Sequence, residues 1–142
     1  MKTIYTTINM HSGDAKLKIR EESKIKTVVH AEFLSDGLKI FIVEYDVLNE
    51  YKNKGYGTML MYTLMGIARA RRLPIILFAT EDSIEFYIKL GFHGLRNYKN
   101  GKYEGKRVTI LNLNNDVDFE HQVGEDDLIW IPPNMDAVVI EI

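Results

Sequence analysis

The chain of 142 residues has no cysteine, only three prolines and one tryptophan. Without cysteine it forms no disulfide, no thiolate nucleophile and no cysteine-ligated metal site. The four histidines (11, 30, 93 and 121) show no metal-ligand spacing, so no metal is expected. The N-terminal segment MKTIYTTINMHSGD lacks the apolar core of a signal peptide, and no apolar run is long enough to span a membrane. We therefore expect a soluble, cytoplasmic protein with no membrane partner.

Basic residues are missing from the end of the chain. Residues 114–142 contain eight Asp or Glu and no Lys or Arg, whereas residues 1–113 carry 18 basic and 12 acidic residues, a formal charge of +6. A basic body favours an anionic ligand, and the acidic tail argues against nucleic acid as a partner. The alternative interpretation of the tail is a solvated acidic end.

Two apolar patches in the tail, Leu128–Ile131 and Ala137–Ile142, favour an ordered segment. Pro132-Pro133 separates them, which is compatible with two short edge strands. We therefore predict a domain at residues 1–113 and a C-terminal β extension at residues 114–142. The extension would pack on the domain or, by edge pairing, on a second copy of the chain as a homodimer.

Hydrophobic periodicity predicts the order of the elements. Alternating or β-branched segments predict strands at Thr3–Asn9, Ala15–Arg20, Lys26–Leu34 and Leu38–Val47, of which the last three are expected to form an antiparallel meander with short connections. The elements expected after the meander are a helix at Gly57–Arg72, a buried strand at Ile75–Thr80, a helix from Asp82 or Ser83 to Leu90, and a hairpin of Leu95–Tyr98 with Arg107–Leu113. The fold class is α/β (an α+β mixed sheet), with helices expected on both faces of the sheet.

Glycines mark the turn between the fourth strand and the first helix. In Val47–Thr58 (VLNEYKNKGYGT), Gly55 and Gly57 stand at the start of the helix. Backbone N–H groups and the positive end of the helix dipole suit a pyrophosphate there, and Lys52 and Lys54 add positive charge. A tight strand–helix turn would also explain the glycines. The P-loop string is absent, and position 60 is leucine where a dinucleotide-binding loop needs glycine.

Two motifs in this region resemble those of one family. Lys52-x-x-Gly55-x-Gly57 resembles the (Gln/Arg)-x-x-Gly-x-Gly/Ala acyl-CoA loop of the GNAT superfamily of N-acyltransferases, although position 52 is lysine. Further along the chain, Phe86-Tyr87-Ile88-Lys89-Leu90-Gly91-Phe92 is similar to the family's second signature. The resemblance covers roughly residues 38–113 and implies a GNAT-like fold. Only the short segment 10–14 stands where the family usually has N-terminal helices, so these helices are reduced and the acceptor side is expected to be open or built by the tail.

The resemblance implies a transferase, an N-acetyltransferase that moves the acetyl group of acetyl-CoA directly to an amine. The acceptor would be a protein lysine, a protein N-terminus or a small amine. Tyr87 matches the tyrosine that protonates the leaving thiolate in many relatives. The acyl-CoA would be held by the backbone of the strand end and loop and by a hydroxyl in place of the family's usual asparagine, that is, by Val47, Leu48, Lys52, Asn53, Lys54, Gly55, Tyr56, Gly57, Thr58 and Thr80. The amide of Val47 or Leu48 would stabilise the tetrahedral oxyanion.

No general base follows from the resemblance. The aligned positions on the fourth strand are Phe41 and Val43, which cannot accept a proton, and regular alternation would put Glu44 and Asp46 on the opposite face. The remaining candidates are water and two side chains of the neighbouring strand, Glu32 and His30. The missing base leaves an alternative function, a non-catalytic acyl-CoA-binding or interaction module on the same fold.

Overall fold

The structure, a computed structural model, describes residues 1–37, 39–80, 82–94, 106–112, 117–123, 127–134 and 137–141. The N-terminal part consists of β1 (Lys2–Asn9), β2 (Asp14–Glu21), β3 (Lys24–Ser35) and β4 (Ile40–Val47). After a short 3-10 turn (Asn49–Tyr51) follow α1 (Tyr56–Arg71), β5 (Ile75–Phe78), α2 (Ile84–Lys89) and β6 (His93–Gly94). The C-terminal strands are β7 (Lys106–Asn112), β8 (Val117–Val123), β9 (Asp127–Trp130) and β10 (Ala137–Glu141).

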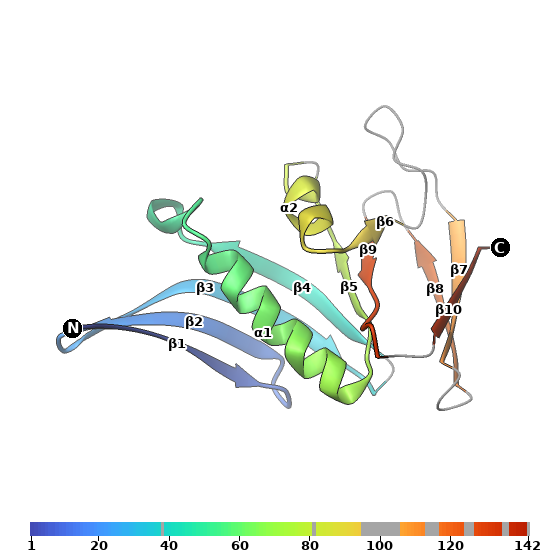
Figure 1. Cartoon of the computed structure of the whole chain (residues 1–142), viewed down its shortest axis with the longest axis horizontal. Coiled ribbons are helices and arrows are strands. Elements are labelled where there is room, and N and C mark those ends of the chain that lie inside the picture. Colours follow the sequence, from blue (N-terminus) through green and yellow to red (C-terminus); the bar gives the residue numbers. More distant parts are fainter. Residues whose placement is uncertain are drawn as a thin grey trace.

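Seven of these strands form one mixed sheet in the order β1-β2-β3-β4-β5-β9-β6, and three form a second sheet in the order β10-β7-β8 (Figure 1). The strands β2 to β4 pair antiparallel, as the predicted meander requires. In addition, β1 pairs antiparallel with β2, and β4 pairs parallel with β5. The mixed sheet expected from the sequence is confirmed. In the part of the chain that is described, no helix combines the length and apolarity needed to cross a membrane.

The helix α1 forms where periodicity predicts it. Its buried positions include Leu60, Leu64 and Ala68, which repeat at helical spacing and pack on β2, β3 and β4. At its end, Arg72 adopts the left-handed conformation and its N–H bonds to the carbonyls of Ala68 and Arg69. Pro74 follows directly and prevents a further turn.

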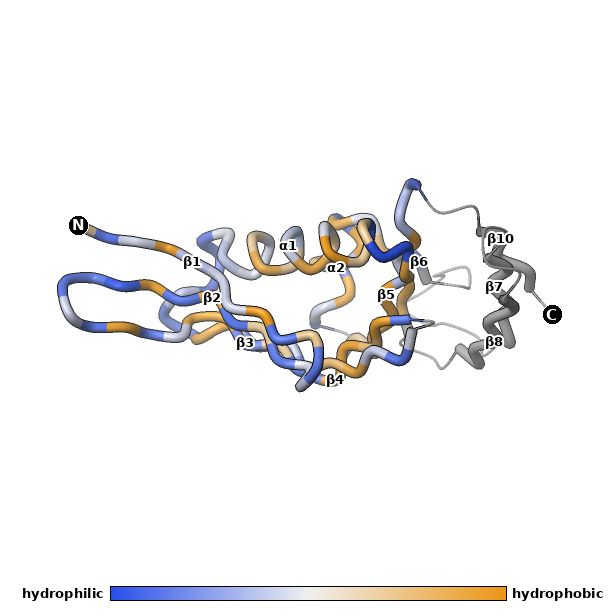
Figure 2. Tube along the Cα trace, turned by 90° about the horizontal axis from the view of Figure 1, so that it is seen from below, coloured by the Kyte–Doolittle hydropathy of each residue, from blue (hydrophilic) through white to orange (hydrophobic). Residues whose placement is uncertain are grey.

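Both helices lie on the same face of the seven-stranded sheet (Figure 2), so the expectation of helices on both faces is wrong for the described residues. The physical reason is the short connection between β1 and β2. The backbone N–H groups of His11 and Ser12 bond to the side chain of Asn9, and Gly13 closes the turn at φ 74°. A Cβ on Gly13 would lie 1.9 Å from the carbonyl oxygen of Phe33, so this turn packs tightly on β3 and leaves no room for a helix.

A β-bulge interrupts β4 where it pairs with β3. Phe33 pairs with Ile42, but Glu32 pairs with Glu44, so Val43 is the extra residue on β4. A bulge of this kind shifts the alternation of side chains by one residue.

The shifted alternation changes the side of the sheet on which the carboxylates of β4 lie. Tyr45 and Val47 now face α1, since the Tyr45 hydroxyl donates to the carbonyl oxygen of Gly57 and Val47 packs beside it. Glu44 and Asp46 therefore lie on the same face as Phe41, away from the helices. The sequence-based placement of these two carboxylates opposite Phe41 is wrong, because regular alternation does not hold across the bulge.

The strand β9 lies inside the main sheet. It pairs with β5 on one side and β6 on the other, and its residues Leu128 and Ile129 are buried. The prediction of an edge strand at Leu128–Ile131 is therefore wrong. The predicted strand at Arg107–Leu113 corresponds to β7, which pairs with β8 and β10. Its predicted hairpin partner, residues 95–98, lies outside the described residues, and the division of the chain at residue 113 stays a prediction.

Candidate functional site

The strands β4 and β5 separate at the middle of the sheet. Their parallel pairing runs from Ile40 with Ile75 to Ile42 with Leu77 and ends there, while β4 continues to Val47. We call the side of Val43–Val47 that faces away from β3 the open edge of β4. Backbone N–H and C=O groups on such an edge are available to pair with an extended ligand.

The direction of the amides follows from one hydrogen bond. The N–H of Leu48 donates to the carbonyl oxygen of Val28 at 3.0 Å. Because hydrogen-bonded pairs alternate along an antiparallel ladder, the N–H groups of Tyr45 and Val47 point away from β3, toward the open edge. Of the two amides predicted to stabilise an oxyanion, that of Val47 has this direction, whereas that of Leu48 is engaged in the sheet.

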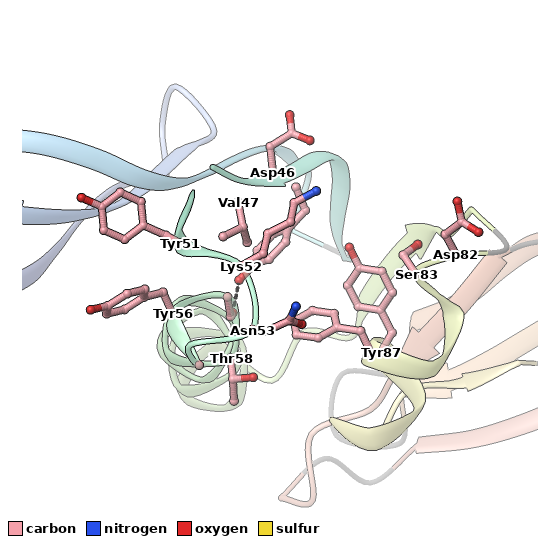
Figure 3. A pocket seen from close by; sticks show the side chains of 14 residues that line it. Asp46, Val47, Tyr51, Lys52, Asn53, Tyr56, Thr58, Asp82, Ser83 and Tyr87 are labelled. Atoms are coloured by element: carbon pink, nitrogen blue, oxygen red, sulfur yellow. Dashed lines mark hydrogen bonds between the residues drawn. The ribbon is translucent and has the colours of Figure 1, made fainter. Parts of the chain in front are cut away.

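A cavity of about 420 Å³ lies between the end of β4, the following loop, the start of α1 and α2 (Figure 3). Eight of the eleven residues named as candidates from the sequence line it: Val47, Lys52, Asn53, Gly55, Tyr56, Gly57, Thr58 and Tyr87. The fold thus brings together two motifs that are well separated in the sequence, one before α1 and one in α2. The individual roles of these residues stay predictions.

The other three candidates lie outside the lining. Thr80 orders the turn before α2, since its carbonyl oxygen accepts from the N–H of Ser83 at 2.9 Å and its hydroxyl lies 3.1 Å from that of Ser83. Lys54 places its ammonium over the Tyr51 ring, 5.6 Å from the ring centre. Leu48 lines a second cavity, described below.

The two glycines of the loop, Gly55 and Gly57, are required for different physical reasons. Gly55 stands at the N-cap of α1 with φ 85°, a conformation that glycine adopts without strain. Gly57 allows close packing, because a Cβ there would lie 3.2 Å from Val47 Cγ2 and 3.4 Å from Phe86 Cζ. Together they let the first turn of α1 approach β4, so that its N–H groups lie beside the cavity, where an anion is favoured.

The Tyr87 side chain is 6% exposed and enters the cavity from α2 (Figure 3). Its ring packs edge-on against Phe86, Phe92 and Tyr45, with ring centres 5.0, 5.7 and 6.3 Å away. Burial, and next the charge of Asp46, raise the pKa of Tyr87 to about 12. The phenol is therefore protonated at neutral pH and can donate a hydrogen bond into the cavity.

Six lining residues were not among the candidates from the sequence: Tyr45, Asp46, Tyr51, Asp82, Ser83 and Phe86. The most consequential is Asp46, which the bulge turns away from its expected face. Phe86 belongs to the second motif, and Asp82 and Ser83 were considered only as the start of a helix. A bulge carries no sequence signal strong enough to have placed Asp46.

Asp46 and Glu44 form a carboxyl pair on the face of the sheet that points away from the helices. A side-chain hydrogen bond with Asp46, and then the charges of Asp46 and Glu32, raise the pKa of Glu44. Two carboxyl groups that share a hydrogen bond hold one proton to higher pH than an isolated carboxyl group does. The pair can therefore accept a proton near the cavity. On the neighbouring strand, His30 Nε2 lies 2.7 Å from Asp14 Oδ1. Among the described residues, no three Asp, Glu or His side chains are grouped as a metal site.

Comparison with known proteins identifies the family. The profile of the Acetyltransferase (GNAT) family matches residues 17–92, more than half of the chain. The chain belongs to the GNAT acetyltransferase family. The matched region of this GNAT chain contains the bulged strand β4, the glycine loop and the helix that carries Tyr87.

Solved structures support the fold. The GNAT chain aligns with Tetrahymena GCN5 at 14% identity, with 84% of this chain and 68% of that chain covered and a TM-score of 0.54. It aligns with Ard1 from Thermoplasma volcanium at 14% identity, with coverages of 82% and 70% and a TM-score of 0.53. It also aligns with a GNAT acetyltransferase from Staphylococcus aureus Mu50 at 14% identity, with 85% of this chain and 69% of that chain covered and a TM-score of 0.53. No curated protein matches the chain.

Proposed function

We propose that this GNAT protein is an N-acetyltransferase that transfers the acetyl group of acetyl-CoA directly to an amine. The observation that carries the proposal is the cavity of about 420 Å³, in which the open edge of β4, the start of α1 and the Tyr87 hydroxyl converge. An acyl-CoA presents a pyrophosphate, an extended amide-containing arm and a thioester. These match, in order, the first turn of α1, the open edge and Tyr87.

The proposed reaction begins with deprotonation of the acceptor. Asp46, paired with Glu44, takes a proton from the acceptor ammonium. The amine nitrogen then attacks the thioester carbonyl carbon, and the oxyanion that forms is stabilised by the N–H of Val47. The C–S bond breaks, the amide product loses its second amine proton to water, and the thiolate leaves with a hydrogen bond from Tyr87.

Binding of acetyl-CoA is the first test. A ligand specific to the native state at 100 times its dissociation constant stabilises the protein by about 2.7 kcal/mol, so acetyl-CoA should raise the melting temperature. Gly55→Asn is a useful probe, since asparagine tolerates the left-handed conformation yet adds a side chain at the cavity. We expect this variant to fold normally and to show a much smaller shift. Absence of a shift in the wild type at millimolar acetyl-CoA would contradict the proposal.

A non-catalytic acyl-CoA-binding module is the second candidate function. It is favoured by Thr80, which stands in place of the family's asparagine and whose hydroxyl lies against Ser83. The two candidates differ in one result: the module binds acetyl-CoA but releases no free thiol in the presence of any amine. The cytoplasmic location and the pairing with a second copy of the chain stay predictions.

A further inference from the structure

The sheet surface opposite α1 and α2, which we call the helix-free face, carries an apolar strip. Ile75 and Leu77 of β5 belong to the core under the helices, so Phe78 points the other way. Leu34 and Val43 lie on the same face as Phe78. Leu34 is 66% exposed, Val43 58% and Phe78 60%. Three large apolar side chains this exposed on neighbouring strands indicate a contact surface.

Four carboxylates lie beside this strip on the same face. In the sheet register Asp14 is opposite Glu32, and Glu32 is opposite Glu44, with Asp46 two residues further along β4. The basic side chains that face them are His30 and Lys16, whose side-chain nitrogens lie 2.7 and 3.7 Å, respectively, from the carboxylate of Asp14. Although residues 1–113 are basic overall, this surface attracts a cation.

A second cavity lies next to the proposed acyl-CoA site. It has a volume of about 410 Å³, and its lining includes Lys16, His30 and Leu48. It shares Asp46 and Val47 with the first cavity, so the end of β4 separates the two. An acceptor bound in the second cavity would approach the end of β4 from the side opposite α1, with its nitrogen next to Asp46.

We propose that the acceptor is a polypeptide that docks on the helix-free face, with a lysine among the carboxylates and an apolar side chain on the strip. This inference rests on the proposed function. Charge complementarity selects the lysine, and the strip requires an apolar neighbour that a small polyamine does not possess. His30 is the register partner of Asp46, and Leu34 lies four residues from His30 along β3, about 13 Å, a distance that an extended peptide covers in four residues. The favoured acceptor therefore carries an apolar residue four positions from its lysine.

The test compares three acceptors with the full-length protein and acetyl-CoA: a peptide with Phe four positions from a single Lys, the same peptide with Ser in place of Phe, and putrescine. We expect kcat/KM for the Phe peptide to exceed that for the Ser peptide by about 10-fold, the discrimination that a modest apolar contact provides. Putrescine is expected to be the poorest acceptor.

Variants assign the preference to the strip. The double variant Leu34→Ser/Phe78→Ser should lose the preference for the Phe peptide while keeping the acetyl-CoA melting shift, because both residues lie outside the open edge of β4. Tyr62→Ser is the matched control, because Tyr62 is 59% exposed on α1 and lies away from the strip. It should keep the preference.

The outcomes are distinguishable. Equal use of all three acceptors by the wild type, or a preference that survives in the double variant, would overturn the docking inference and leave the proposed function standing. Binding of acetyl-CoA with no thiol release for any of the three acceptors would overturn both.

Discussion

Replacement of Tyr87 by phenylalanine separates two ways in which its hydroxyl can assist the leaving thiolate. The phenol has a pKa of about 12, whereas an ordinary thiol has a pKa of about 8.5. Complete proton transfer from Tyr87 to the thiolate is therefore uphill by roughly 5 kcal/mol. A hydrogen bond to the departing sulfur avoids this cost. Since a hydrogen bond to a charged group is worth about 1.5–3 kcal/mol, Tyr87→Phe should lower kcat by about 10- to 150-fold.

The assay is steady-state thiol release with a lysine peptide, with acetyl-CoA affinity measured separately by calorimetry. We expect Tyr87→Phe to lower kcat and to leave the affinity nearly unchanged, because the ring and its packing remain. Tyr45→Phe serves as the control: it removes the hydrogen bond to Gly57 at the loop and should affect stability and affinity more than kcat. Unchanged kcat in Tyr87→Phe would refute the assigned role, and a loss well above about 1000-fold would show that Tyr87 transfers the proton completely.

Three further predictions concern the loop, the carboxyl pair and β9. Gly57→Ala should weaken acetyl-CoA binding, measured by calorimetry, because the added Cβ presses on Val47. As a control, Gly66→Ala in α1 adds a Cβ that meets nothing within 4 Å, and it should raise the free energy of unfolding, measured by urea titration, by about 1 kcal/mol. Because the pKa of Glu44 is raised, wild-type kcat/KM should decrease on the acid side of its pH profile at a pH above the ordinary glutamate pKa of about 4.3. The variant Asp46→Asn should shift this acid-side decrease to lower pH and lower kcat at least about 100-fold. A variant pH profile identical to that of the wild type would exclude the carboxyl pair as the base. Ending the chain after residue 113 removes two buried side chains of β9, whose burial together stabilises the fold by about 3–6 kcal/mol. The truncated chain should therefore lose cooperative thermal unfolding. A sharp unfolding transition would instead support a domain boundary at residue 113.

Local signals were sufficient for the elements that build most of the site. The apolar repeat of α1, the cations of its last turn and Pro74 predict the helix almost to the residue. Gly91, at φ 102°, closes α2 as its sequence position indicates. These features are decided by neighbours within one or two turns, so they can be predicted from the sequence.

The errors arose where distant segments decide the structure. The bulge at Val43 depends on how β3 and β4 pair, and it determines that Asp46 lies on the same face of the sheet as Phe41. The position of β9 between β5 and β6 depends on the pairing of Asp127–Trp130 with strands that end much earlier in the sequence, at Phe78 and Gly94. A short apolar run such as Leu128–Ile131 fits an edge strand and a central strand equally well, because both need only a few apolar residues.

The most direct test of the account is the fate of the acetyl group in a single turnover. The protein is mixed with acetyl-CoA labelled in the acetyl group and with the lysine peptide, and the masses of the peptide and of the intact protein are followed together. Direct transfer predicts a labelled amide on the peptide, free thiol in equal amount and no labelled protein at any time. Bound acetyl-CoA with no labelled peptide, or labelled protein that forms first and decays as the peptide gains the label, would contradict it.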